Sequence, residues 1–114
     1  MKNLGISTLL KQAQKIQEDI AKIKQELAGM KVTGSSGGGM VEVTANGRQQ
    51  ILDIKIDNEL FNSYDIEMIE DLIVAAVNQA LERSQELANE QMSKATGGIL
   101  SNIPEGLKIP GFGL

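Results

Sequence analysis

The first third of the chain carries apolar residues at a regular helical spacing. From Leu9 to Met30 they recur four, three, four and three residues apart, in an unbroken heptad pattern. The positions are Leu9, Ala13, Ile16, Ile20, Ile23, Leu27 and Met30. Ser7 or Thr8 is a suitable N-cap, and Gly29 is placed to end the helix. The pattern predicts a long amphipathic helix, whose stripe packs on a second helix of the same chain or also meets a partner subunit.

The middle of the chain changes to the alternation that is typical of strands. Lys31–Ser35 is expected to form a short first strand, and the glycine-rich run Gly34–Gly39 a loop. This run opens into a strand-like segment, and no Gly-Lys-Ser/Thr follows it, so we interpret it as a connector and not a phosphate loop. Met40–Ala45 and Arg48–Asp57 are predicted strands. Asn46-Gly47 joins them as a type I′ turn, which needs positive φ at both positions.

A two-residue turn would fix the register of this hairpin. It places Ala45 opposite Arg48, Val43 opposite Gln50 and Val41 opposite Leu52. One face then carries Val41, Val43, Leu52, Ile54 and Ile56. The other face carries Glu42, Thr44, Gln49, Asp53 and Lys55, with Ile51 as an apolar exception. Such a sheet is expected to pack its apolar face under the helices and to leave the other face in water.

A second long helix is predicted from about Ile66 to about Ala95, where a wide apolar stripe is suited to covering the sheet. Asp65 or Ser63 can cap its first turn. The fold class is therefore α+β, an α-β-β-β-α subunit with a small antiparallel sheet and two long helices. We expect residues 1–98 to form a single domain with helical arms. Residues 99–114, rich in Gly and Pro with scattered apolar residues, are expected to be a flexible or docking tail.

The composition argues against catalysis. The chain contains no Cys and no His, so thiolate chemistry and the commonest general base are absent. Its carboxylates fall where helix caps and polar faces need them, and neither a metal site nor a cofactor site is expected. No small-molecule substrate is indicated, and we expect no enzyme. No apolar run approaches membrane-spanning length, and the first residues lack the apolar core of a signal peptide, which indicates a cytoplasmic protein.

Size and aromatic content point to self-association. The chain has 114 residues with one Tyr, two Phe and no Trp, so its core must come from aliphatic side chains. A chain of this length buries a modest fraction of its surface. Two long apolar stripes and a sheet are hard to cover within one subunit. We therefore expect a second copy of the chain to cover part of this surface.

Charge is unevenly distributed along a chain whose formal net charge is −4. Residues 1–33 hold six lysines against three acids, whereas residues 63–96 hold two cations against seven acids. Lys11, Lys15 and Lys22 fall at outward positions of the heptad. Their ordinary interpretation is a solvated helix face. The functional alternative is a stripe of cations that contacts phosphates.

Several short motifs occur together in a familiar order. They are Leu10–Gln14 with the following heptad, Val32-Thr33-Gly34 before Val41-Glu42-Val43, Asn46-Gly47, Ile56-Asp57, Glu70–Ala80, and Pro104 with Leu107–Pro110. In this combination the chain resembles the bacterial YbaB/EbfC nucleoid-associated family over nearly its whole length. The resemblance implies a homodimer whose helical arms project in a tweezer-like arrangement. It also implies binding to double-stranded DNA with little sequence preference, nucleoid organisation and an influence on gene expression.

Duplex DNA is bound mainly through neutralisation of its phosphates, so the candidate contacts are cations. They are Lys11, Lys15, Lys22, Lys24, Arg48, Lys94 and Lys108. If about four phosphates are neutralised, the log–log salt dependence of the affinity has a slope of roughly −3.6. We expect weak, salt-sensitive binding. The alternative is a dimeric, coiled-coil-like scaffold that recruits a protein partner through its arms or its tail.

Overall fold

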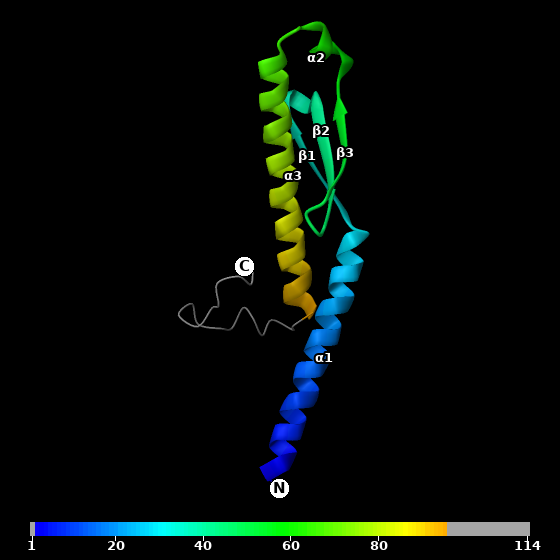
Figure 1. Cartoon of the computed structure of the whole chain (residues 1–114), viewed down its shortest axis with the longest axis vertical. Coiled ribbons are helices and arrows are strands. Elements are labelled where there is room, and N and C mark those ends of the chain that lie inside the picture. The colour runs from blue at the N-terminus through cyan, green and yellow to red at the C-terminus, as the bar shows by residue number, and fades with distance from the viewer. Residues whose placement is uncertain (1, 96–114) are drawn as a thin grey trace, which may run out of the picture. The chain divides into compact units, whose positions relative to one another are not determined.

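The computed structural model describes residues 2–95, with side chains from residue 5 onward. Its elements are α1 (Lys2–Ala28), β1 (Lys31–Ser36), the 3₁₀ turn η1 (Gly37–Gly39), β2 (Val41–Asn46), β3 (Ile51–Ile56), α2 (Asn58–Asn62) and α3 (Ile66–Ala95) (Figure 1). This order confirms the α-β-β-β-α prediction and adds one short helix, α2. The tail predicted at residues 99–114 lies outside the described residues.

The described residues form two compact units. One unit comprises residues 27–88, which hold the sheet, α2 and most of α3. The other contains α1 up to Glu26 and the last turns of α3 from Asn89. Within residues 2–95, neither long helix has an apolar stretch of the length needed to cross a membrane.

The sheet has the order β1-β2-β3, and both strand pairs are antiparallel. The central strand, β2, supplies the middle of the core, because Val41, Val43 and Ala45 are fully buried. Ala76 and Ala80 of α3 pack with them, and α2 contributes Leu60. The α3 ribbon runs along one face of the sheet (Figure 1). A core made of such small side chains requires the helix and the sheet to approach closely.

Gly34 is where α3 and the sheet come closest. A Cβ at this position would lie 2.4 Å from the backbone oxygen of Ala76 and 2.4 Å from the backbone nitrogen of Ala80. The sequence placed Gly34 in both the first strand and the loop, and only its place in the strand is confirmed. It is a strand residue opposite Val43, and glycine is used there because a helix backbone occupies the space of a side chain.

Three hydrogen bonds join one flank of α3 to residues of β1. The Ser36 hydroxyl donates to the Leu72 carbonyl at 2.6 Å, and the Ser35 amide donates to Oε1 of Gln79 at 2.7 Å. The Arg83 guanidinium donates to the Thr33 carbonyl at 2.7 Å. These bonds place α3 over β1 and leave its opposite flank beside β3.

The predicted hairpin register was wrong. The pairs are Val41 with Ile56, Val43 with Ile54, and Ala45 with Ile51, so β3 begins three residues later than expected. The turn is correspondingly longer than Asn46-Gly47. Positive φ is adopted by Gln49 (60°), whereas neither Asn46 nor Gly47 adopts it. The Asn-Gly pair therefore does not form a type I′ turn here.

A β-bulge explains the apolar exception at Ile51. The register shifts between Thr44 and Ala45, which leaves Leu52 as the extra residue between two regular pairs. Ile51 then lies opposite the buried Ala45 and returns to the helix-facing side of the sheet. The adjacent apolar residues Ile51 and Leu52 interrupt the alternation of the strand, and this interruption was the sequence signal of the bulge.

Asn46 and Gly47 instead attach the hairpin to the end of α1. The Gly47 amide donates to the Leu27 carbonyl at 2.9 Å and to the Met30 carbonyl at 3.1 Å. A Cβ on Gly47 would lie 2.7 Å from a methyl carbon of Leu27 and 2.8 Å from its oxygen. The Asn46 amide group donates to the Ala28 carbonyl at 3.3 Å. This dipeptide therefore binds carbonyls at and just beyond the end of α1, where the helix itself supplies few donors.

The helix boundaries were predicted with mixed success. Gly29 follows the last residue of α1, and α3 spans the predicted Ile66–Ala95. The carboxylate of Asp65 accepts the Met68 amide at 3.0 Å, which confirms this residue as a cap. The first helix begins before Ser7, so the predicted caps at Ser7 or Thr8 were wrong. Both lie inside α1, because a helix tolerates Ser and Thr within its first turns.

Candidate nucleic-acid interface

Lys11, Lys15 and Lys22 share one face of α1. Their spacing of four and seven residues places them within about 40° of arc on a helix with 3.6 residues per turn. All three side chains are exposed. We call these three residues the lysine row. Such a row presents its positive charges to one side, as a duplex backbone requires.

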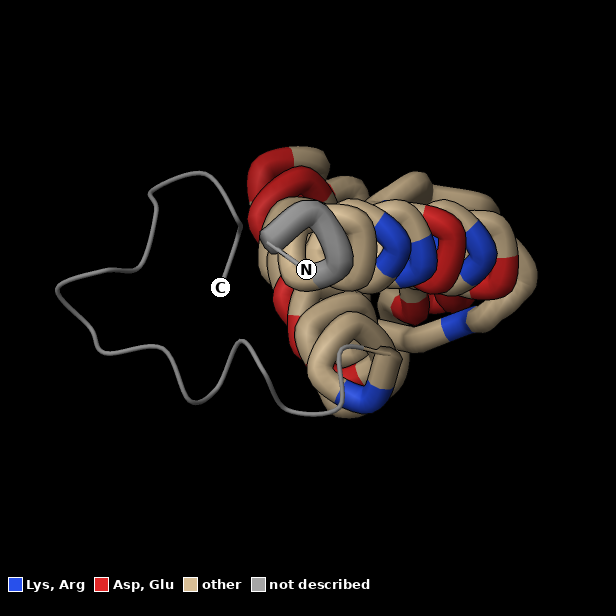
Figure 2. The backbone as a smooth tube through the Cα atoms, turned by 90° about the horizontal axis from the view of Figure 1, so that it is seen from below, with Lys and Arg blue, Asp and Glu red and all other residues tan. Residues whose placement is uncertain are grey.

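One acid interrupts the lysine row. Glu18 lies three residues after Lys15 and four before Lys22, so it occupies the same face of α1, and it is exposed. Figure 2 shows acidic and basic positions interleaved along α1. A carboxylate in this place lowers the local positive potential. It also makes the row weaker than its lysine count suggests.

The other predicted contacts do not join the lysine row. Lys24 lies on the opposite side of α1 from Lys22, because two residues span about 200° of a helix. Lys94 of α3 forms a salt bridge with Glu90 at 3.4 Å, and both side chains are largely exposed. Arg48 is exposed in the hairpin turn, where its amide donates to Oδ1 of Asn46 at 2.9 Å. Lys108 lies outside the described residues.

Three exposed cations of the described residues, Lys31, Lys55 and Arg83, were not among the predicted contacts. Lys31 and Lys55 lie on the polar face of the sheet, at the start of β1 and near the end of β3. Strand alternation placed Lys55 on that face. Its cross-strand neighbour is Glu42, which limits its use as a phosphate contact.

Exposed charge is the main property that this candidate interface offers to a ligand. Among residues 2–95, no group of three or more His, Cys, Asp and Glu side chains is placed to hold a metal ion. From Asp65 to Glu90, α3 and its cap carry seven acids against one cation, Arg83, whose side chain is bonded to β1. A polyanion would be repelled by this helix and attracted by the lysine row.

The sequence model of the YbaB/EbfC DNA-binding family matches residues 1–99. The chain belongs to the YbaB/EbfC DNA-binding family. The expected resemblance is thereby confirmed. The family is one of nucleoid-associated DNA-binding proteins and is not a class of enzymes.

Curated relatives agree with this assignment. A nucleoid-associated protein of Syntrophobacter fumaroxidans is 50% identical over 103 residues, which cover 90% of this chain and 91% of the relative. One from Caldanaerobacter subterraneus is 48% identical over 88% of each chain. One from Paramagnetospirillum magneticum is 46% identical over 96% of this chain and 99% of the relative. The likeness therefore extends over nearly the full length of these proteins.

The fold also occurs among solved structures. The crystal structure of an uncharacterized protein from Helicobacter pylori superposes with a TM-score of 0.66 at 25% identity. The match covers 74% of this chain and 88% of the other. The architecture of this chain is therefore also found in an experimentally determined structure.

Proposed function

We propose that this YbaB/EbfC protein binds double-stranded DNA as a homodimer, with little sequence preference, through the lysine row of α1. The observation that carries the proposal is the single exposed face shared by Lys11, Lys15 and Lys22. Lysine is a point charge on a flexible stem, so a row of lysines suits phosphates better than base edges. The relatives are named nucleoid-associated proteins, and the proposal extends to this chain a role in organising the nucleoid and influencing gene expression.

Uncovered apolar surface supports the homodimer. The end strand β3 exposes Ile51, Leu52 and Ile54, although Ile54 lies opposite the buried Val43. Val74 of α3 is also exposed, while Val77 and Leu81 at the same helical face are half-buried. This face is the flank of α3 turned away from β1. We call β3 and this flank the apolar flank, and a second copy would cover it.

A salt-titrated binding assay tests the DNA function. Fluorescence anisotropy of a labelled duplex should give a log–log slope of roughly −3.6 for the wild type. Changing Lys11, Lys15 and Lys22 to Glu should weaken binding at low salt by at least about tenfold, because phosphate contacts are lost. Each lost contact should also reduce the steepness of the salt dependence by about one. The change Glu18→Lys should strengthen binding, since it completes the row.

A matched control separates the lysine row from net charge. Changing Lys24, Lys31 and Lys55 to Glu alters the net charge by the same amount at exposed sites off the row. This control variant should lose much less duplex affinity than the variant of the lysine row. Equal losses in the two triple variants would assign binding to total charge. No binding by the wild type at low salt would remove the DNA function from this member of the family.

A further inference from the structure

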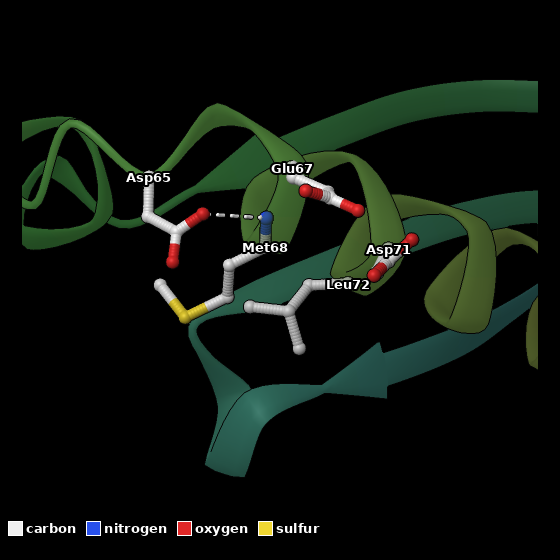
Figure 3. Close-up of a pocket in the computed structure, with 5 residues that line it drawn as sticks. All are labelled: Asp65, Glu67, Met68, Asp71 and Leu72. Atoms are coloured by element: carbon white, nitrogen blue, oxygen red, sulfur yellow. Dashed lines mark hydrogen bonds between the residues drawn. The ribbon is translucent and has the colours of Figure 1, made fainter.

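Four apolar side chains are exposed where α2 meets α3. Phe61, Tyr64, Ile66 and Met68 are 54%, 89%, 69% and 37% exposed, although they lie within eight consecutive residues. We call them the corner surface. Met68 and Leu72 extend to the same side of α3, beside a shallow hollow of about 310 Å³ (Figure 3). Isolated exposed apolar residues are ordinary, whereas four of them in one short segment make it a candidate interaction site.

The backbone beneath the corner surface is held firmly. Asp57 accepts the Glu59 amide at 2.9 Å at the start of α2, and Leu60 is anchored in the core. The Ser63 hydroxyl accepts the Asp65 amide at 3.3 Å, and Asp65 in turn caps α3. The apolar side chains are therefore presented by an ordered backbone, which lowers the entropy lost on binding.

Charge indicates what kind of partner fits. No Lys or Arg lies between Lys55 and Arg83 in the sequence. The acids in and around the corner surface are Asp57, Glu59, Asp65, Glu67, Glu70 and Asp71, and Asp65, Glu67 and Asp71 line the hollow. Such a surface repels DNA and attracts cations. It is also distinct in sequence from the lysine row and from the apolar flank.

We propose that the corner surface docks a short, cationic, amphipathic segment of another protein. Leucine-like anchors of that segment would cover Phe61, Ile66 and Met68, and its Lys or Arg side chains would lie against the surrounding carboxylates. Apolar anchors with a charged rim are the usual composition of such contacts. The proposal does not depend on DNA binding, because it uses none of the lysines.

The chain contains its own reporter for this contact. Tyr64 is its single tyrosine, and there is no tryptophan, so intrinsic ultraviolet emission reports on the corner surface alone. The probe is a synthetic peptide of leucine and lysine at amphipathic helical spacing, added to the full chain. We expect a saturable change in Tyr64 emission. Oligolysine and a leucine–glutamate peptide of the same spacing should bind at least about tenfold more weakly, since one lacks the anchors and the other the charge.

Variants localise the binding. Phe61→Ser should weaken it about tenfold, as expected for an apolar anchor. Glu67→Lys with Asp71→Lys should weaken it by at least as much. The matched control is Glu82→Lys with Glu86→Lys, which changes the same charge at exposed sites further along α3 and should leave the affinity unchanged. For Tyr64→Gly, measured by calorimetry, we expect a loss of affinity with the fold retained, because φ is +56° there and glycine adopts that angle without strain.

Three results would overturn the proposal. One is an equal loss of affinity from the Glu67/Asp71 and Glu82/Glu86 variants, which would indicate non-specific attraction to α3. Another is tight binding of the leucine–glutamate peptide. The third is concentration-dependent assembly beyond a dimer that Phe61→Ser abolishes, which would assign the surface to a second copy of this chain. Duplex binding is measured in parallel and should be unaffected by Phe61→Ser, so failure of the DNA function is recognised separately.

Discussion

Glycines at two positions allow backbones to touch that side chains would separate. At Gly34 the neighbour is α3, and at Gly47 it is Leu27. Neither is used for a positive φ. The three glycines of η1 do adopt positive φ and let the chain turn from β1 into β2. Glycine in this protein therefore serves two separate purposes, close approach and turning.

Gly34→Ala should destabilise the protein severely. The new methyl group would meet backbone atoms of Ala76 and Ala80, which cannot move aside as a flexible side chain can. We expect a loss of at least about 3 kcal/mol in the free energy of unfolding, or no folded protein, measured by urea denaturation. Gly5→Ala is the control, because its Cβ meets nothing within 4 Å and alanine favours a helix. A loss below about 1 kcal/mol for Gly34→Ala would contradict the close packing.

At the scale of elements, the hairpin turn, α3 and the end of α1 are joined by buried polar groups. Ser84 is fully buried, donates to the Asn46 carbonyl at 2.7 Å and accepts the Gln49 amide at 3.0 Å. Oδ1 of Asn46 accepts the amides of Arg48 and Gln50. With the bonds from Asn46 and Gly47 to the last turn of α1, these contacts form one network.

Ser84→Ala should remove the centre of this network. The Asn46 carbonyl and the Gln49 amide would keep only their bond to each other at 3.3 Å, and the loss of both Ser84 bonds should cost about 1 kcal/mol. The free energy of unfolding from urea titration measures the loss. Ser35→Ala, at an exposed serine of β1, should change it by less than about 0.5 kcal/mol. Similar values for both variants would show that the network contributes little.

The sequence alone predicted the helices and strands, but it did not predict the turn and the register that connect the strands of the hairpin. Periodicity located α3 and its start at Ile66, and the three successive strands followed from alternation. The hairpin register could not be found this way, because Asn46-Gly47 fits a type I′ turn locally, while tertiary bonds to Leu27 and Ser84 impose a longer one. Likewise, heptad position placed the lysine row on one face, but the pairing of Lys94 with Glu90 depends on side-chain conformation.

For the whole molecule, the apolar flank and the lysine row set the expected assembly. A subunit that leaves β3 and one side of α3 uncovered has apolar area to bury against a second copy. A dimer also doubles the number of lysine rows, which strengthens an otherwise weak attraction to DNA. Because α3 is acidic, we expect it to repel a duplex, and the proposed contact is therefore with α1.

Ile54→Lys should prevent dimer formation. A lysine in the centre of the apolar flank would place a charge in a buried interface without a partner, at a cost of several kcal/mol. Light scattering at micromolar concentration should report about twice the chain mass of 12.3 kDa for the wild type and a single chain for the variant. Phe61→Lys, an equal change at an exposed site off the flank, should remain dimeric. A monomeric wild type would refute the assembly.

The bonds around Asn46-Gly47 also bear on chemical ageing. Asparagine followed by glycine is the dipeptide most prone to deamidation, in which the glycine nitrogen attacks the asparagine side-chain carbonyl, closes a succinimide and expels ammonia. In this protein the Gly47 nitrogen is bound to two carbonyls, and the Asn46 side chain is buried with its oxygen already accepting two amides. The attack requires the turn to open first. The rate of ammonia loss at Asn46 therefore follows the local opening of the hairpin, and the folded turn preserves its own asparagine.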